Sequence, residues 1–389
     1  MKPHPNTLLA VPAQVRRAQL PVTPEIVQTT TFHMDAELDA AMAGGDYRSQ
    51  FLYTRMGNPT VEALQRQLAS LHGAESCVCT ASGMGAISAA LFGLMRPGGI
   101  VIADTQLYGV TQSFLRNYLE PAGRHVWFAN LADPSERARI ATLHPGSDDN
   151  TDTWVLVETL SNPLIQPADL PAMVEFASAI GAGLMVDNTF AGPTVCRPLE
   201  LGADVVIESL SKIIAGHSDV HGGAVLGYDT LVEKAWSAML HLGTCLDPHA
   251  AWLVMRGLRT LHLRAPAAAA NAVAVADWLR AHPEVEEVYF PSVPPGWLSS
   301  PGQMLSFVVV GGDVRAERLL EHLQLIARAT SLGGTESLAS LPFNTSHRTP
   351  QAREAVGLKA GTVRLSVGIE HIGDLIADLD QALEASAAP

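Results

Sequence analysis

Short apolar runs without polar alternation divide the middle of the chain. Four of them end at an acidic residue: Ile100–Ala103 before Asp104, Val155–Val157 before Glu158, Leu184–Val186 before Asp187, and Val205–Ile207 before Glu208. Continuous apolar runs are typical of strands that are buried on both faces of a sheet. Because helix-like segments such as residues 170–183 separate them, the pattern predicts a mostly parallel sheet with helices on both faces. In such sheets, ligands bind at the carboxyl ends of the strands.

A helix is expected before this sheet, starting at the sequence Asn58-Pro59-Thr60. Proline is tolerated in the first turn of a helix, and apolar residues then recur at helical spacing through residue 71. Gly73 is expected to end this helix.

Residues 76–95 read as a strand, a turn and a second helix, with the letters SGMG in the turn. Gly83 and Gly85 would let backbone N–H groups approach an anion at the helix N-terminus. A dinucleotide-binding loop is an alternative interpretation of the same turn. Against it, Ser88 stands where the third glycine of that loop would be, and no acidic residue follows a second strand in the expected manner.

The pattern changes after about residue 240, where long helix-like segments are followed by strand-like segments and an amphipathic tail. Five prolines in the first 24 residues discourage regular structure there. We therefore expect an N-terminal arm over residues 1–52, a large domain over 53–240 and a smaller C-terminal α/β domain over 241–389.

Composition narrows the class of protein. The chain has 389 residues, of which 47% are apolar and 16% charged, and these values indicate a globular protein. Its net charge of −14 and the lack of a long basic cluster argue against nucleic acid as a partner. No signal peptide and no membrane span are evident, so we expect a cytoplasmic protein. The four cysteines have no metal-ligand spacing, and no metal site is expected.

Lys212 is the most conspicuous candidate for chemistry. It is one of only four lysines, and it stands in an apolar context within DVVIESLSKIIAGHSDVHGG. An amine in partly apolar surroundings loses its proton easily and can then form a Schiff base with a carbonyl. A lysine that merely extends from a strand edge to water is the alternative. The hydroxyls of Ser209 and Ser211 favour the chemical interpretation, because they would suit an anchored phosphate.

This stretch resembles the lysine segment of the Cys/Met-metabolism family of enzymes that depend on pyridoxal 5'-phosphate (PLP). The segment departs from the usual family pattern at Ser211, where threonine is usual, and at Leu210 and Ile213. The resemblance covers nearly the whole chain. It implies the aminotransferase-like fold of PLP enzymes (fold type I), with residues 53–240 as the PLP-binding domain and Lys212 as the residue that holds PLP.

The resemblance implies further cofactor contacts. Asp187, in DNTF, would keep the pyridine nitrogen protonated, so that the ring accepts electrons. Tyr108, in LYGVT, would stack on the ring and exchange a proton with the leaving group. Asn162 would lie near the phenolic oxygen and the substrate carboxylate, while Gly83 and Met84 would bind the phosphate. Taken singly, Asp187 could be an ordinary helix cap and Tyr108 an ordinary core aromatic.

Two more motifs gain a role from the resemblance. The loop YTRMGNPT would place Tyr53 and Arg55 on the cofactor phosphate of a neighbouring subunit, which implies a dimer with shared sites and, by family likeness, a tetramer. Arg364, in VRLSVGIE, would clamp the α-carboxylate of the substrate, because a guanidinium suits bidentate binding. Ser331 and Leu332 would line the same pocket. The alternatives are a surface loop and an exposed strand arginine.

The resemblance also implies that the substrate is a small amino acid, and three positions bear on which amino acid it is. Cystathionine γ-lyases of the human kind carry charged residues where this chain has Leu52, Ser113 and Thr330. Methionine γ-lyases have small or apolar residues there, but a cysteine in place of Val110 and a Lys-Asp pair near residues 239–241.

We therefore expect α,γ-elimination on an L-amino acid with an uncharged or unusual distal group, as in methionine or homocysteine, which yields 2-oxobutanoate and ammonia. The alternatives are cystathionine γ-lyase activity, γ-replacement on an O-acylhomoserine as in cystathionine γ-synthase, canavanine γ-lyase activity, and an inactive binding protein with the same fold.

Overall fold

The computed structural model describes residues 22–45, 47–143, 152–291, 296–345 and 348–387. Over these residues, a seven-stranded sheet runs in the order β1-β7-β6-β5-β4-β2-β3. Its strands are β1 (Ser76–Thr80), β2 (Ile100–Asp104), β3 (His125–Ala129), β4 (Thr153–Glu158), β5 (Gly183–Asp187), β6 (Val205–Glu208) and β7 (Gly223–Gly227). Strands β2 to β6 pair in parallel, and β7 lies antiparallel between β6 and β1. The predicted mostly parallel sheet is confirmed.

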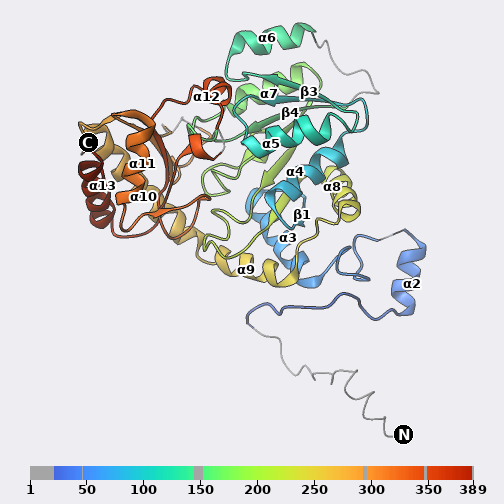
Figure 1. The fold of residues 1–389 in the computed structure, drawn as a ribbon. Helices are drawn as coiled ribbons and strands as arrows, with labels where there is room; N and C mark the ends of the chain where they lie inside the picture. Colours follow the sequence, from blue (N-terminus) through green and yellow to red (C-terminus); the bar gives the residue numbers. More distant parts are fainter. Residues whose placement is uncertain (1–21, 46, 144–151, 292–295, 346–347, 388–389) are drawn as a thin grey trace.

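Helices cover both faces of this sheet (Figure 1). Within β4, Val155 and Val157 pack into the core beside helices α3, α7 and α9, while Trp154 and Leu156 pack into the core beside α4 and α8. This two-sided burial explains the apolar runs without alternation. The helices named here are α3 (Pro59–His72), α4 (Gly83–Leu94), α7 (Leu170–Ala179), α8 (Asp229–Leu242) and α9 (Pro248–Leu258).

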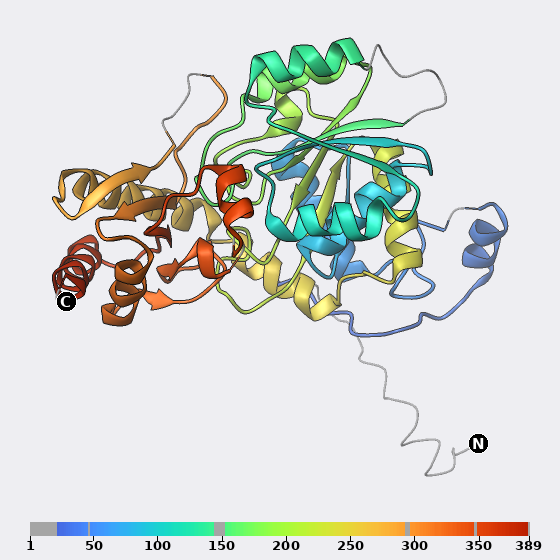
Figure 2. The same cartoon turned by 45° about the horizontal axis from the view of Figure 1, so that its top comes forward.

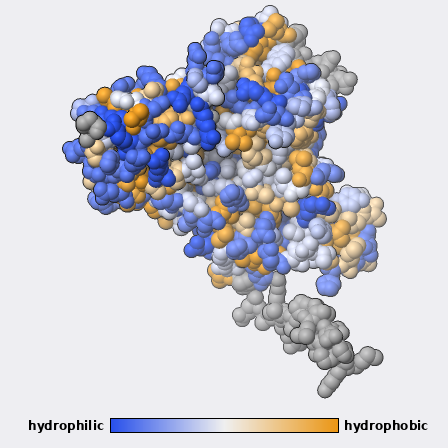
Figure 3. Space-filling view, viewed as in Figure 1, coloured by the Kyte–Doolittle hydropathy of each residue, from blue (hydrophilic) through white to orange (hydrophobic). Residues whose placement is uncertain are grey.

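A five-stranded sheet in the order β10-β11-β12-β9-β8 lies in the C-terminal part, beside the larger sheet (Figure 2). Helices α10, α11 and α13 share a second apolar core with it. The bounds are α10 (Leu261–Ala281), β8 (Val285–Tyr289), β9 (Met304–Val309), α11 (Gly312–His322), β10 (Ala327–Arg328), β11 (Leu338–Ser340), β12 (Thr362–Ser366) and α13 (Ile372–Ser386). On the face that Figure 3 shows, polar residues dominate this part, with small apolar patches between them. The domain boundaries at residues 52 and 240 stay a prediction.

The helix predicted after Asn58 is confirmed, including both of its ends. The Asn58 side chain accepts a hydrogen bond from the Thr60 N–H, and Gly73 adopts the left-handed conformation at the other end. The remaining short helices are α2 (Ala36–Ala43), α5 (Gly109–Phe114), α6 (Pro134–Leu143) and α12 (Pro350–Val356). No helix in the described part of the chain is both long and apolar enough to span a membrane.

The predicted arm contains the helix α2, which lies at the outer edge of the molecule (Figure 1). The irregular structure predicted for the first 24 residues concerns mainly residues 1–21, which lie outside the described ranges. The start of α2 is capped, because the Asp35 side chain accepts a hydrogen bond from the Leu38 N–H. The prolines that suggested irregular structure all precede this helix in the sequence.

Candidate active site

The carboxyl ends of the parallel strands border a cavity of about 1110 Å³. Strand register brings the predicted chemistry together, since Asp187 pairs with Glu158 on one side and with Ile207 on the other. Residues of the C-terminal part also line the cavity. The predicted site residues that line it are Gly83, Met84, Tyr108, Asn162, Asp187, Ser209, Ser211, Lys212, Ser331, Leu332 and Arg364.

Lys212 lies in the turn that follows β6, and its Nζ donates a hydrogen bond to the Ser331 Oγ at 2.6 Å. Burial lowers the pKa of the Lys212 amine, and the positive charge of Arg364 lowers it further. The amine is therefore more easily neutral than that of an exposed lysine, as a nucleophile requires.

Asp187 ends β5, and its Oδ1 accepts hydrogen bonds from the Thr189 hydroxyl at 2.5 Å and the Thr189 N–H at 3.1 Å. Burial raises the pKa of the Asp187 carboxyl. A protonated ring nitrogen beside this carboxylate would compensate its buried charge and favour the ionised form. The carboxyl thus suits the pyridine nitrogen of PLP.

The start of α4 suits a phosphate. The Ser82 side chain caps the helix by accepting a hydrogen bond from the Gly85 N–H, so other N–H groups of the first turn remain available for an anion. A Cβ at Gly83 would lie 2.8 Å from the Ser209 Cβ, so only glycine permits this approach. The Ser211 hydroxyl accepts a hydrogen bond from the Gly222 N–H at 3.0 Å. The Ser211 hydroxyl also donates to the Gly222 carbonyl at 3.3 Å, and on rotation of the hydroxyl the same proton can reach an anion instead.

Arg364 projects from β12 toward Asn162 and Ser331. It donates to the Asn162 Oδ1 at 2.8 Å and to the Ser331 carbonyl at 3.3 Å. Burial lowers the pKa of Arg364 to about 10. Ser331 has a positive φ of 84°, a conformation that turns its carbonyl toward Arg364 while its hydroxyl meets Lys212. The amine and the guanidinium therefore face the same part of the cavity.

Tyr108 stands directly before α5, and its backbone N–H donates to the Glu158 Oε1. Burial raises the pKa of the Tyr108 phenol, and Arg364 opposes this rise. Glu158 itself lines the cavity, and no site role was predicted for it. Burial, followed by the charges of Asp187 and Asp104, raises the Glu158 pKa well above its usual value. The sequence feature that could have identified Glu158 as a site residue is its position at the end of an apolar run.

Thr189 was also missed, although the sequence DNTF includes it. Its hydroxyl donates to Asp187 and accepts a hydrogen bond from the Ser209 N–H at 2.9 Å. This single side chain links the predicted ring contact to the predicted phosphate contact. Other lining residues without a predicted role are Phe190, His221, Glu336, Thr345 and Arg348.

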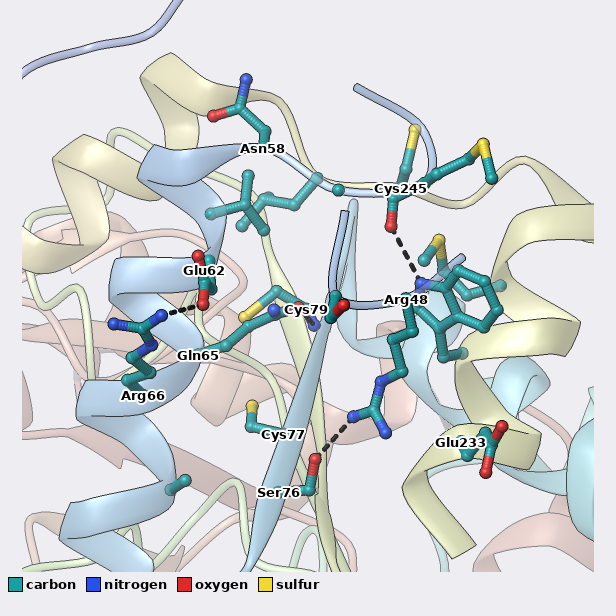
Figure 4. A pocket seen from close by; sticks show the side chains of 18 of the residues that line it. Arg48, Asn58, Glu62, Gln65, Arg66, Ser76, Cys77, Cys79, Glu233 and Cys245 are labelled. Atoms are coloured by element: carbon teal, nitrogen blue, oxygen red, sulfur yellow. Dashed lines mark hydrogen bonds and ion pairs between the residues drawn. The ribbon is translucent and has the colours of Figure 1, made fainter. Parts of the chain in front are cut away.

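Tyr53 and Arg55 are not among the residues that line this cavity. The Arg55 guanidinium lies 5.6 Å from the centre of the Tyr53 ring, and Arg55 borders a second cavity of about 730 Å³. Figure 4 shows that second cavity, where the Arg48 guanidinium donates to Ser76. The expectation that Tyr53 and Arg55 serve a neighbouring subunit stays a prediction.

The cysteines Cys77 and Cys79 lie on the wall of the second cavity (Figure 4). Both are buried and neither forms a disulfide. Over the described ranges, no cluster of three or more histidine, cysteine or acidic side chains could hold a metal ion.

The positions considered for substrate choice separate into two groups. Val110, Ser113 and Thr330 line the large cavity, whereas Leu52 does not. Met239 borders the second cavity instead. Ser113 and Thr330 stand where cystathionine γ-lyases carry charged residues. Both line the large cavity here, and both are uncharged. Arg348 lines the same cavity and adds a positive charge to it.

Comparison with known proteins identifies the family. The profile of the Cys/Met metabolism PLP-dependent enzymes matches residues 7–384. An L-methionine gamma-lyase of Pseudomonas putida is 39% identical over 382 residues, which cover 94% of this chain and 93% of that protein. An O-succinylhomoserine sulfhydrylase of Pseudomonas aeruginosa is 36% identical, with 97% and 94% covered.

Among solved structures, a cystathionine gamma synthase of Xanthomonas oryzae in complex with cystathionine superposes with a TM-score of 0.85. It is 36% identical and matches 94% of this chain and 93% of its own. The predicted α/β fold of PLP enzymes (fold type I) is confirmed. The chain therefore belongs to the family of PLP-dependent enzymes of cysteine and methionine metabolism.

Proposed function

We propose that this enzyme carries out α,γ-elimination on an L-amino acid of the methionine or homocysteine kind and releases 2-oxobutanoate and ammonia. The observation that carries the proposal is the pair of Lys212 and Arg364, which meet at Ser331 inside the cavity. The uncharged Ser113 and Thr330 support a substrate with an uncharged distal group. Several L-methionine gamma-lyases are among the relatives, which agrees with this choice.

When bound, PLP supplies an aldehyde that links to the substrate amine and a ring that withdraws electrons from Cα. Lys212 holds the cofactor before the substrate arrives and then takes the Cα proton with its freed amine. The lowered pKa of Lys212 supports this role, because only the neutral amine is a base. Asp187 keeps the proton on the ring nitrogen, while Gly83, Met84, Ser209 and Ser211 bind the phosphate.

Arg364 binds the α-carboxylate of the substrate and so fixes Cα near Lys212. Asn162 accepts one Arg364 hydrogen bond at 2.8 Å and holds the guanidinium in place. Tyr108 lies on the same cavity wall and protonates the departing sulfur at Cγ. Lys212 would pass on the Cα proton and then take a proton from Cβ, and the electron pair left at Cβ would form the Cβ–Cγ double bond as the Cγ–S bond breaks and Tyr108 protonates the sulfur.

A second candidate is γ-replacement on an O-acylhomoserine whose acyl group ends in a carboxylate. Arg348 lines the cavity and supplies a cation for such a group. Two relatives have names that indicate such a reaction: an O-succinylhomoserine sulfhydrylase and a cystathionine gamma synthase.

The test is release of 2-oxobutanoate from L-methionine and from L-cystathionine, side by side, with PLP present. Faster release from methionine supports the proposal. Faster release from cystathionine would assign the enzyme to the cystathionine γ-lyases. Release from neither, together with consumption of O-succinylhomoserine in the presence of a thiol, would establish the second candidate instead.

A further inference from the structure

A closed polar cluster lies outside the cavity, directly behind the strand ends that carry the site. It consists of Thr159 after β4, Asn188 after β5, Glu208 at the end of β6, and His72 at the end of α3. Each of the four is at most 1% exposed. None of them lines the cavity, and the proposed chemistry uses none of them.

The contacts of the cluster are well defined on the strand side. The Thr159 hydroxyl donates to the Asn188 Oδ1 at 2.7 Å, and the Asn188 Nδ2 donates to the Glu208 Oε1 at 2.9 Å. The helix side is different. The His72 Nε2 lies 3.6 Å from the Glu208 Oε1, and neither ring nitrogen of His72 has a hydrogen-bond partner among the described residues. A fully buried imidazole with no partner requires an explanation.

The cluster is coupled to the site through the backbone. Asn188 directly follows Asp187, and Glu208 directly precedes Ser209. The Thr189 hydroxyl joins these two segments, because it contacts both Asp187 and the Ser209 N–H. A shift of Glu208 toward or away from α3 would therefore move the predicted ring contact and the predicted phosphate contact together.

The burial and the neighbours of Glu208 and His72 determine whether each side chain is charged. Burial, opposed by the Asn188 hydrogen bond and reinforced by the charge of Asp187, raises the pKa of Glu208 to about 8. Burial and then the charge of Arg197 lower the pKa of His72 to about 4. Cys196 and Glu200 are the other titratable groups on this side. At neutral pH, the carboxyl thus keeps its proton while the imidazole stays uncharged.

We propose that Glu208 and His72 form a neutral pair, with the proton on the Glu208 carboxyl, and that this pair positions Asp187 and Ser209 for PLP without placing a second negative charge beside Asp187. The protonated carboxyl faces the unpartnered His72 Nε2 across 3.6 Å, so the end of α3 packs against the end of β6 without a buried charge on either side chain. The inference rests on the proposed roles of Asp187 and Ser209, whereas the proton on Glu208 can be tested without them.

The proton on Glu208 is tested by infrared spectroscopy of the cofactor-free protein. The difference between wild type and Glu208→Gln at pH 6 should contain the carbonyl stretch of a protonated carboxylic acid. This band should fade as the pH rises through about 8, the pKa of Glu208. A difference spectrum that contains only a carboxylate band at pH 6 would overturn the proposal, because Glu208 would then be ionised.

The positioning role is tested by exchanging the two residues. His72→Glu alone brings two acids together and should weaken PLP binding by on the order of tenfold or more. The double variant His72→Glu with Glu208→His restores one acid and one imidazole, and it should recover most of this loss. His125→Glu, at an exposed position, is the matched control. PLP affinity is measured by absorbance titration, without turnover.

Recovery of PLP binding in the exchanged variant supports the proposed pair of one acid and one imidazole. If the two side chains only had to fill a given volume, PLP binding would not depend on which of the two positions carries the acid. A folded exchange variant that binds PLP no better than His72→Glu would overturn the positioning role. If wild type itself failed to bind PLP, the proposed function would fail, and the infrared result would still decide whether Glu208 holds a proton.

Discussion

Arg364 is the residue whose geometry most limits the substrate. Its two hydrogen bonds, to Asn162 and Ser331, orient a planar fork that lysine cannot reproduce. We expect Arg364→Lys to lower kcat/KM by roughly 10- to 100-fold, mainly through KM, because one charge-assisted hydrogen bond is lost. Steady-state kinetics with L-methionine would measure this. Arg66→Lys, at an exposed pair with Glu62, is the control and should change neither constant. An unchanged KM in Arg364→Lys would contradict the carboxylate role.

At the scale of single residues, sequence reasoning found the side chains that carry recognisable chemistry. Lys212, Asp187 and Arg364 were identified from their motifs, and the structure brings all three to one cavity. Thr189 and the His72–Glu208 pair were missed. Their importance comes from contacts between segments distant in sequence, as between residues 72 and 208, and no local pattern encodes such a contact.

At the scale of elements, α4 and the turn after β6 come into close contact at Gly83 and Ser209. A Cβ on Gly83 would meet the Ser209 Cβ at 2.8 Å, so Gly83→Ala must push the helix start away from Ser209. We expect PLP affinity to fall by on the order of tenfold, since the phosphate contacts of both segments would separate. The control is Gly44→Ala, where a Cβ would have no neighbour nearer than 3.4 Å. Equal PLP affinity in both variants would contradict the phosphate assignment.

Elements were predicted best where packing is two-sided and worst where the pattern is weak. Strands β2, β4, β5 and β6 were evident, because burial on both faces requires uninterrupted apolar residues. Strand β7 was not predicted. Its sequence GAVLG is rich in glycine, and a Cβ at Gly223 would lie 2.1 Å from the Ser82 carbonyl oxygen. Gly223 is needed because two segments approach each other closely at this position. From the sequence alone, a glycine-rich stretch of this kind resembles a loop.

At the scale of the whole molecule, the position of Tyr53 and Arg55 outside the chain's own large cavity has a consequence. If Arg55 serves a neighbouring subunit, two inactive variants can complement each other. We expect equal amounts of Arg55→Ala and Lys212→Ala subunits, dissociated and reassembled together, to recover roughly a quarter of the wild-type activity, because half of the dimers would have one complete site. No activity above that of the separate variants would show that Arg55 does not act across subunits.

Buried acids give the whole molecule a pH-dependent stability. Burial raises the pKa of Asp104 to about 6, so the native state holds a proton that the unfolded state has released between about pH 4 and 6. Stability from this group is present below that window and is lost as the pH rises through it. Asp104→Asn should therefore raise the free energy of unfolding at pH 7 by up to about 3 kcal/mol, but hardly at pH 4.

Thermal melting of the cofactor-free protein at the two pH values would measure the effect of Asp104→Asn. An equal shift of Tm at both pH values would contradict the assignment to a titrating carboxyl. Asp229→Asn is the matched control, because hydrogen bonds and Arg48 lower the pKa of Asp229 and its removal should not stabilise the protein.

The proposed role of Lys212 is tested most directly by locating the covalently held cofactor. The chain has only four lysines, at positions 2, 212, 234 and 359, so reduction of the PLP-loaded enzyme with borohydride followed by peptide mass spectrometry gives a clear answer. We predict that the cofactor mass is found on the peptide containing Lys212, and that Lys212→Ala loses both this mass and the release of 2-oxobutanoate. Cofactor mass on another lysine, or full turnover by Lys212→Ala, would contradict the central claim.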